Sequence, residues 1–387
     1  MWLMSMNNSS PFFESININL KKSNSSYLFN NLDGKRYLDL ISMYSSMPLG
    51  YNHQIFDKKF QEEVNAVSHL KMCNGLYTTD EFLLFKKEFI KILPKNIRNI
   101  HFSSTGSLAV ESAIKCAFSK KSNQNSKVLI LRNSFHGIGT WGFFTDKEIG
   151  SVKKRIEFCK DSEWVSFLEP EEIIQAINNS DQNIAAVLIE PIQCTSGDTY
   201  ISPKDLKEIN LLCKKKDICF IIDEIQTGFG TTGEMWISAR YKLDPDIIIF
   251  GKKAQISGIA TNDYFSDAIK SPSRILNVTF DGDLIDAIRS KYIIQAINQF
   301  SLLENVKTKS ELLKAELSNF FPTYRSIGFI IALDFENQRK RDNFVSNCLK
   351  DLVLVNPTGS HTVRIRPNLA FNDSELDKLV NTFKKNS

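Results

Sequence analysis

The sequence of 387 residues lacks the features of several classes of protein. No apolar run approaches the roughly 18 to 20 residues that a membrane-spanning helix needs, so we expect no membrane association. The 48 basic and 44 acidic residues are spread along the chain without the basic block typical of nucleic-acid binding. The first residues contain neither a basic nor a sustained apolar segment, which is unlike a secretory signal.

Motifs for metals, disulfides and nucleotides are also missing. The seven cysteines are scattered without a C-x-x-C pair, and the five histidines are dispersed, so we expect no metal site. No phosphate loop of the form G-x-x-x-x-G-K-[ST] is present. We expect Cys213 and Cys219 to be reduced thiols of the core, and the protein to be soluble and cytoplasmic.

Apolar runs of strand length alternate with stretches of helical periodicity through the middle of the chain. This order predicts an α/β fold with a mostly parallel sheet, which places any ligand at the carboxyl ends of its strands. We expect strands over Ile100–Ser104, Lys127–Arg132, Ala185–Pro191, Cys219–Ile225 and Asp246–Gly251, and helices over Leu108–Ser119, Pro170–Asn178 and Pro203–Lys216.

The two ends of the chain follow another pattern. Ser26–Leu40 predicts a hairpin that turns at Asp33-Gly34. Toward the other end, a long amphipathic helix over Leu284–Leu303 leads into strand-like segments at Gly328–Phe335 and Thr362–Arg366. We therefore expect a smaller α+β domain beside the large one. The expected boundaries are residues 1–44 for an N-terminal arm and part of the small domain, 45–275 for the large domain, and 276–387 for the rest of the small domain.

The most informative feature is an acid and a lysine at the ends of two buried strands. Asp223 ends the run that begins at Cys219, and Lys252 follows the run that begins at Asp246. Their spacing of 29 residues (252 − 223) suffices for a crossover between parallel strands. Pyridoxal phosphate needs a lysine for its aldehyde and an anion for its pyridinium nitrogen, so the pair suits this cofactor. Either element alone also occurs as an ordinary solvated strand end.

Two further turns follow strands at the same edge of the expected sheet. Gly106 and Ser107 open a helix, where free amides and the helix dipole favour a phosphate, although capping by Thr105 or Ser107 would explain the same residues. In the turn that carries Phe135, the aromatic ring could stack on a flat heterocycle and the following glycine would permit close approach. A core phenylalanine beside a surface His136 is the alternative interpretation.

Gln226 and Arg364 complete the set of candidates. Gln226 lies three residues beyond Asp223, where its amide could donate to a phenolate oxygen. Arg364, in the strand-like segment near the end of the chain, could bind a carboxylate with its planar fork. A salt bridge at the end of a strand would explain Arg364 equally well.

From about Tyr27 to Phe383, the chain resembles the class III, fold type I, pyridoxal-phosphate aminotransferases, and among them the lysine 6-aminotransferases. The combination of a strand ending in Asp-Glu-x-Gln-Thr-Gly with a second strand ending in Gly-Lys is highly specific. The other segments that carry the resemblance are Tyr37–Leu40, Gly106–Glu111, Glu190–Gln193, Phe250–Gln255 and Ser273–Thr279.

The resemblance implies a role for each candidate. Lys252 would bond covalently to the cofactor and move the proton of the reaction, and Asp223 would keep the pyridine nitrogen protonated. Lys253 is expected to be structural. The other cofactor contacts would come from Gly106, Ser107, Phe135 and Gln226, and from Thr279 of the partner subunit, which implies a homodimer with shared active sites.

Two positions depart from the lysine 6-aminotransferase pattern. Ile138 stands where those enzymes have an arginine after Phe-His-Gly, and Thr195 stands where they have the glutamate that shields Arg364. At Ile138 one contact to a substrate carboxylate is therefore lost. At Thr195 the glutamate that would switch Arg364 between substrates is replaced. An apolar wall disfavours the second carboxylate of a dicarboxylate. We expect an apolar, non-lysine substrate, poor use of 2-oxoglutarate, and a single α-carboxylate, such as that of alanine or pyruvate, on Arg364.

The predicted function is transfer of an amino group between a small-molecule amine or amino acid and an aldehyde or keto acceptor, by a ping-pong mechanism. Three alternatives remain open from the sequence. The first is lysine 6-aminotransferase activity proper. The second is another pyridoxal-phosphate reaction on the same scaffold, such as racemisation or an aminomutase. The third is a catalytically silent homologue that kept the fold.

Overall fold

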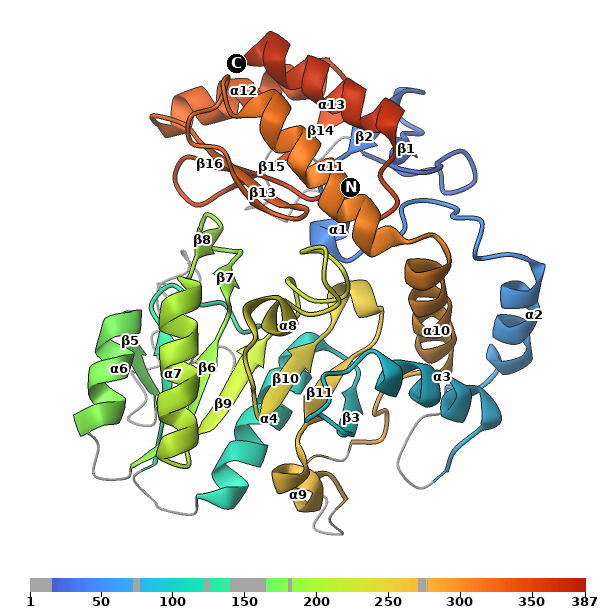
Figure 1. Ribbon diagram of the computed structural model, residues 1–387. Helices are drawn as coiled ribbons and strands as arrows, with labels where there is room; N and C mark the ends of the chain where they lie inside the picture. The colour runs from blue at the N-terminus through green and yellow to red at the C-terminus, as the bar shows by residue number, and fades with distance from the viewer. Residues whose placement is uncertain are drawn as a thin grey trace, which may run out of the picture. The chain divides into compact units, whose positions relative to one another are not determined.

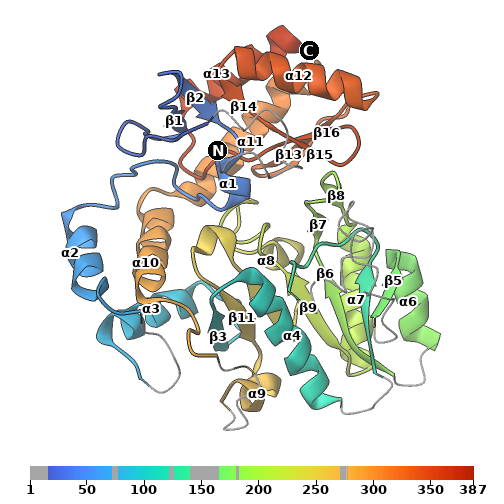
Figure 2. The same ribbon diagram turned by 180° about the vertical axis from the view of Figure 1, so that it is seen from behind.

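The structure is a computed structural model that describes residues 16–71, 77–121, 126–139, 165–179, 183–270, 276 and 278–387 (Figures 1 and 2). The chain forms two compact units. The large unit comprises residues 58–229 and 234–295, and the small unit comprises residues 1–57, 230–233 and 296–387. In the described part of the chain, no helix combines the length and apolar character needed to cross a membrane. The expected arm over the first residues lies mostly outside the described residues.

A seven-stranded sheet forms the centre of the large unit, in the order β3-β11-β10-β9-β6-β4-β5. Strand β11 runs opposite to the other six strands of this sheet, which confirms the predicted mostly parallel sheet. The central strands are aliphatic and buried on both faces, as helix-covered parallel strands require. The bounds are β3 Asn99–Ser103, β4 Lys127–Leu131, β5 Val165–Leu168, β6 Ile184–Ile189, β9 Cys219–Asp223, β10 Ile247–Phe250 and β11 Ser257–Thr261.

Helices cover both faces of this sheet, with α4 on one face and α6 and α7 on the other (Figures 1 and 2). All three were expected within two residues of their observed ends. The helical bounds of the large unit are α2 Lys58–Val67, α3 Asp80–Lys91, α4 Gly106–Lys120, α6 Pro170–Asn179, α7 Pro203–Lys215, α8 Ile237–Tyr241, η3 Lys252–Ala254, η4 Asp263–Phe265 and α9 Ser266–Lys270. Helix α10, Leu284–Gln299, begins in the large unit, and its last turn belongs to the small unit. A short hairpin, β7 Ile192–Gln193 with β8 Thr199–Tyr200, follows β6.

The small unit contains two sheets and three long helices. One sheet has the order β1-β2-β14 and the other the order β12-β13-β16-β15. The bounds are β1 Tyr27–Phe29, β2 Arg36–Asp39, α1 Ser42–Ser45, α11 Leu302–Leu317, β12 Arg325–Ile327, β13 Ile330–Asp334, α12 Gln338–Lys350, β14 Val353–Leu354, β15 Asn356–Thr358, β16 Thr362–Ile365 and α13 Asp373–Asn386.

Two expectations for these segments meet different outcomes. The hairpin is confirmed, because β1 pairs with β2 in antiparallel register and Gly34 takes a left-handed φ of 71° in the connection. The single helix over Leu284–Leu303 is wrong. Helix α10 ends at Gln299, Ser301 has a left-handed φ of 49°, and α11 begins at Leu302. A left-handed residue cannot continue an α-helix, so Ser301 divides the predicted helix in two.

Candidate active site

A cavity of about 300 Å³ lies at the carboxyl edge of the large-unit sheet, within the size range of small-molecule sites. It contains seven of the residues that the sequence proposed for cofactor or substrate binding: Gly106, Ser107, Phe135, Ile138, Asp223, Gln226 and Lys252. The other lining residues are Thr105, His136, Gly137, Glu190, Ile192, Ile225, Thr227 and Ser257. Because β4, β6, β9 and β10 are parallel, their ends deliver these side chains to one edge.

Asp223 is the last residue of β9, and its carboxylate is held from two sides. Its Oδ2 lies 2.8 Å from Nδ1 of His136, and its Oδ1 accepts from the backbone N–H of Ile225 at 3.1 Å. Asp223 is 5% exposed and His136 is 1% exposed. The interpretation of His136 as a surface residue is therefore wrong, because its ring is buried against the acid. Two contacts fix the orientation of the carboxylate inside the cavity.

Lys252 follows β10 and lines the same cavity. It has a φ of 48°, a left-handed conformation that a residue with a Cβ adopts at a cost of about 1–3 kcal/mol. Such strain concentrates at functional sites, where the surrounding structure holds one side chain in a required direction. Lys253 is only 1% exposed, as a structural residue would be.

Helix α4 presents its first turn to the cavity. Thr105 is its N-cap and accepts from the backbone N–H of Leu108 at 3.2 Å, so the capping interpretation is correct for Thr105. Gly106 and Ser107 line the cavity beside this cap, where free amides and the helix dipole favour an anion. Gly137 has a φ of 97°, and a Cβ on it would lie 2.5 Å from Oγ of Ser107. Glycine is therefore required for this turn to approach the helix.

Glu190 is a cavity residue whose role the sequence did not reveal. It directly follows β6, is 6% exposed, and accepts from the backbone N–H of Phe135 at 2.8 Å. The pKa of Glu190 is raised to about 7, chiefly by burial; the charge of Asp223 contributes to the rise, and His136 and Lys252 oppose it. Its place after a buried parallel strand matches that of Asp223. The same argument from strand ends could therefore have selected it.

Three other predicted residues lie outside the lining of this cavity. Thr195 is half-buried in the turn between β7 and β8. Thr279 is exposed beyond α9, and Arg364 is a half-buried residue of β16 in the small unit. Their proposed contacts with cofactor or substrate stay predictions.

The large-unit cavity fits pyridoxal phosphate by the chemistry of its donors. It combines a lysine on a strained turn, a fixed carboxylate, a helix N-terminus suited to phosphate, and the half-buried ring of Phe135. A mostly parallel α/β sheet with this set at its carboxyl edge defines a fold type I pyridoxal-phosphate enzyme. The structure brings the seven proposed cavity residues together.

The chain belongs to the aminotransferase class-III family, because the model of that family matches residues 9–386. It is 29% identical to the L-lysine-epsilon aminotransferase of Mycobacterium tuberculosis, covering 94% of this chain and 90% of that protein. It is 28% identical to a 4-aminobutyrate aminotransferase of Schizosaccharomyces pombe, over 92% and 86% of the two chains.

Solved structures agree with this assignment. The M. tuberculosis lysine aminotransferase superposes with a TM-score of 0.88 at 27% identity, covering 96% of this chain and 94% of that one. The ornithine aminotransferase of Toxoplasma gondii, at 20% identity and a TM-score of 0.85 over 99% and 92% of the chains, supports the fold alone. The protein is accordingly a class III pyridoxal-phosphate-dependent aminotransferase, and the predicted fold, cofactor and reaction type are confirmed.

Proposed function

We propose that this aminotransferase moves nitrogen between an amine or aldehyde with a substantial apolar portion and a partner that carries one α-carboxylate, by a ping-pong mechanism. The observation that carries the substrate class is the wall of the cavity at Ile138. This side chain is 80% exposed and lines the cavity, so a bound substrate would cover it and remove apolar surface from water. A second carboxylate at the same place would lose hydration without gaining a cation.

Bound pyridoxal phosphate supplies an aldehyde that accepts the amine and a ring that withdraws electrons from the reacting carbon. In our proposal, Lys252 would hold the cofactor through its aldehyde, and Nζ of Lys252 would carry the proton that moves during the reaction. Asp223, oriented by His136, would face the ring nitrogen and favour its protonated form. Gly106 and Ser107 would hold the phosphate, and Gln226 and Phe135 would hold the ring.

Arg364 is proposed to bind the carboxylate of the partner substrate, and Thr195 stands at the place where the lysine enzymes have their acidic switch. Alanine and pyruvate suit such a site because each has a single carboxylate. Lysine 6-aminotransferase activity proper is the second candidate. The similarity to the M. tuberculosis L-lysine-epsilon aminotransferase over nearly the whole chain favours it.

The test is an absorbance spectrum of the purified protein with pyridoxal phosphate, followed by addition of single amines. We expect a band in the violet region that bleaches with an apolar amine and with alanine, and is restored by the matching carbonyl acceptor. Lysine and 2-oxoglutarate should act poorly. Turnover with that pair at a rate typical of lysine aminotransferases would reject the apolar substrate and favour the second candidate. Conversion of one substrate without transfer of nitrogen would indicate a racemase or aminomutase.

We also propose that the protein is a homodimer, in which Thr279 of the partner subunit completes the phosphate site. The described surface of the large unit supports this, because Leu83, Leu84 and Ile90 of α3 are exposed, as are Val278 and Phe280 beside Thr279. Sedimentation equilibrium should give twice the chain mass. Thr279→Ala should weaken cofactor binding without dissociating the dimer, whereas a monomer with full cofactor affinity would contradict the proposal.

The cytoplasm is the proposed compartment. Its support is that Cys116, Cys194, Cys213, Cys219 and Cys348 are buried free thiols, a form that reducing conditions preserve. The expectation for Cys213 and Cys219 as core thiols agrees with their burial. Localisation of a tagged chain by cell fractionation tests this compartment directly.

A further inference from the structure

Glu190 lies where the ends of two parallel strands of the large unit meet. Strands β4 and β6 pair in parallel register, with Ile130 opposite Leu188, so the residues that follow the two strands lie together at the carboxyl edge of the sheet. Glu190 directly follows β6, and its Oε1 accepts from the backbone N–H of Phe135 at 2.8 Å. Because Glu190 is buried, the accepting carboxylate is largely sheltered from water.

Residues 135–138 form the part of the connection after β4 that borders the cavity, and we call them the aromatic loop. Two further contacts tie this loop to the site. Nδ1 of His136 lies 2.8 Å from Oδ2 of Asp223, and the backbone N–H of Ile138 donates to Oγ of Ser107 at 3.2 Å. The aromatic loop is therefore joined to the end of β9 and to the first turn of α4, as well as to the residue that follows β6.

Two other side chains of the segment after β6 hold the connection after β4 outside the lining of the cavity. Nε2 of Gln193 donates to the carbonyl of Arg132 at 2.5 Å. The hydroxyl of Ser196 donates to the carbonyl of Asn133 at 2.8 Å. These two contacts fix the start of the connection, whereas the contact of Glu190 fixes the part that reaches the cavity.

We propose that Glu190 is a positioning residue of the reaction, which acts through the N–H of Phe135 and keeps the aromatic loop in the place that the cofactor requires. The proposal rests on the proposed cofactor contacts of Phe135 and Asp223, and it adds the group that holds the loop between them. Glu190 supplies an acceptor at one point in space, which an amide oxygen could supply equally. A displaced acceptor would leave the N–H of Phe135 without its partner, at a cost that favours movement of the loop.

The consequence is that one hydrogen bond supports two features of the cofactor site. A shift of the aromatic loop would move the ring of Phe135 and the imidazole of His136 together, because the two residues are neighbours in the chain. Ile138 keeps its own contact with Ser107, so the apolar wall of the cavity should move less. Loss of the Glu190 contact should therefore affect cofactor binding and the rate of transamination more than the half-saturating concentration of an amine.

The experiment compares Glu190→Leu, Glu190→Asp and Glu190→Gln in the full chain. Each protein, stripped of cofactor, is titrated with pyridoxal phosphate, and the dissociation constant is read from the violet absorbance band. Glu190→Leu removes the acceptor and should raise that constant about 10- to 100-fold, the loss of one hydrogen bond to a charged group. Glu190→Asp keeps the charge but draws the acceptor back by one methylene, so it should cause part of this loss. Glu190→Gln keeps an acceptor in place and should stay within about threefold of the parent.

The rate of the reaction is the second readout. The single-turnover rate of bleaching is measured on the fully loaded variants, with the amine that acts best on the parent. We expect the loss of rate to be largest for leucine, smaller for aspartate and smallest for glutamine. A glutamine variant impaired at least as strongly as the aspartate variant would overturn the positioning role, because the charge of Glu190 would then matter more than the place of its oxygen. A leucine variant with unchanged cofactor binding and rate would overturn it as well.

A matched control and a double variant show whether the effect passes through the aromatic loop. Ser196→Ala removes a hydrogen bond of the same length from the same connection, outside the cavity, and should change neither readout by more than about twofold. Phe135→Leu combined with Glu190→Leu should weaken cofactor binding by less than the two single losses together, because both changes act on one loop. Full additivity of the two losses would contradict the proposed route through Phe135.

Other outcomes concern the function on which the inference rests. If Phe135→Leu alone binds the cofactor as the parent does, the proposed stacking of Phe135 fails. If no amine bleaches the parent protein, the proposed substrates fail, whereas the cofactor titration still decides the role of Glu190. Thermal unfolding of each variant identifies any that do not fold. Should the leucine variant be among them, the comparison of aspartate with glutamine carries the test, because both variants keep a polar group at the buried site.

Discussion

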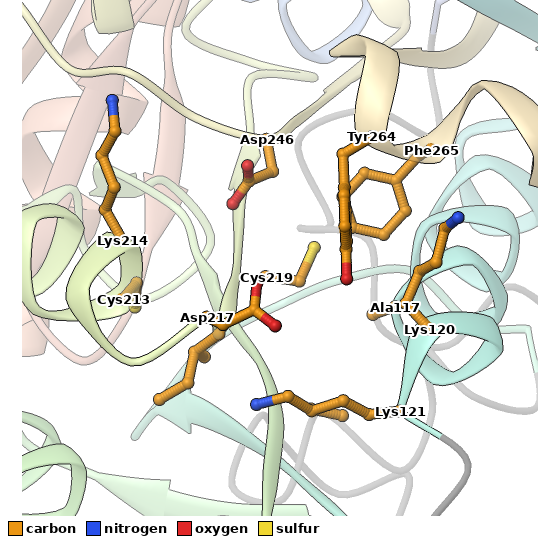
Figure 3. A pocket seen from close by; sticks show the side chains of 12 residues that line it. Ala117, Lys120, Lys121, Cys213, Lys214, Asp217, Cys219, Asp246, Tyr264 and Phe265 are labelled. Carbon is orange, nitrogen blue, oxygen red and sulfur yellow. The ribbon is translucent and has the colours of Figure 1, made fainter.

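The two edges of the large-unit sheet both carry a cavity with charged side chains, yet they are built differently. The carboxyl edge holds the cavity with Asp223 and Lys252. The amino edge holds a cavity of about 230 Å³ with three lysines, two aspartates and two of the buried cysteines (Figure 3). Size and charge are therefore similar at the two edges, and neither property alone identifies the active site.

The partners of the charged groups distinguish the edges. At the amino edge, Oδ2 of Asp246 accepts from the backbone N–H of Phe220 at 2.9 Å, and Oδ1 accepts from the Asn262 amide at 2.6 Å. Lys121 donates to the carbonyl of Ile184 at 3.1 Å, and Lys214 pairs with Asp244 at 2.6 Å. The contacts of Asp246 connect the ends of neighbouring strands, and those of the two lysines connect helix ends to strand starts, which is a structural use of charge.

At the carboxyl edge, polar groups converge instead on the space of the cavity. Asp223, Glu190 and Lys252 all line it, and the turn of Lys252 is strained to bring the lysine there. The comparison teaches that the destination of the hydrogen bonds, more than the count of charges, separates a reactive cavity from a structural one.

The largest expected effect comes from removing one charge at each edge. Asp223→Asn should lower the transamination rate at least about 100-fold, the cost of losing a preorganised electrostatic partner. Asp246→Asn should leave the rate nearly unchanged. It should reduce the free energy of unfolding by about 1–3 kcal/mol, because the amide NH₂ cannot accept from the second of the two donors, whose hydrogen bonds are partly buried. Single-turnover absorbance and urea unfolding measure the two quantities. Loss of activity in both variants without a difference in stability would remove the distinction between the edges.

A smaller effect concerns two buried glutamates of the carboxyl edge. Burial raises the pKa of Glu190 to about 7, and it does the same to Glu224, which accepts from the backbone N–H groups of Ile237 and Ser238. An acid whose folded pKa is raised binds its proton longer in the folded state. Stability therefore falls as the pH rises from the unfolded pKa, about 4.3, to about 7, and levels off above it.

Glutamine in place of either glutamate should reduce that fall. We expect Glu190→Gln to lose less thermal stability than the parent between pH 5 and pH 7.5, measured without substrate. The amide keeps an acceptor for the Phe135 N–H, so the contact itself survives. All other groups titrate alike in the variant and in the parent, so their contributions cancel when the two stabilities are subtracted. A variant whose stability declines with the parent's full slope would show that Glu190 does not carry a raised pKa.

Much of this fold could be predicted because its central strands are short aliphatic runs with clear ends. The runs that end at Asp223 and Phe250 are buried throughout. Asp223 and Lys252, which lie at or just after their ends, fall at one edge by the geometry of parallel strands. Strand β11 was missed because its sequence, Ser257–Thr261, is small and partly polar and joins the sheet through pairing with distant segments. Strand β5 is a half-exposed edge strand without a distinct pattern.

The site was predictable where a residue follows a strand and not where burial decides its role. His136 has no local signal for burial, because its partner Asp223 lies 87 residues away along the chain. The sequence around Asn356 likewise gives no local signal of the residue's position in the sheet. Only the cross-strand register places it opposite Arg364, and a one-residue shift would turn it to the other face of the sheet.

The smallest effect should come from Lys214 at the amino edge. It is 69% exposed and pairs with the half-exposed Asp244, so Lys214→Ala should change the free energy of unfolding by about 0–1 kcal/mol. The cofactor absorbance and the half-saturating amine concentration should be unchanged, and salt should mask any difference in stability. Urea unfolding at low and high salt, with an amine titration beside it, makes the measurement. A shifted absorbance band would mean that the amino edge communicates with the cofactor, and the lysines of that edge would then need a role beyond joining strand starts to helix ends.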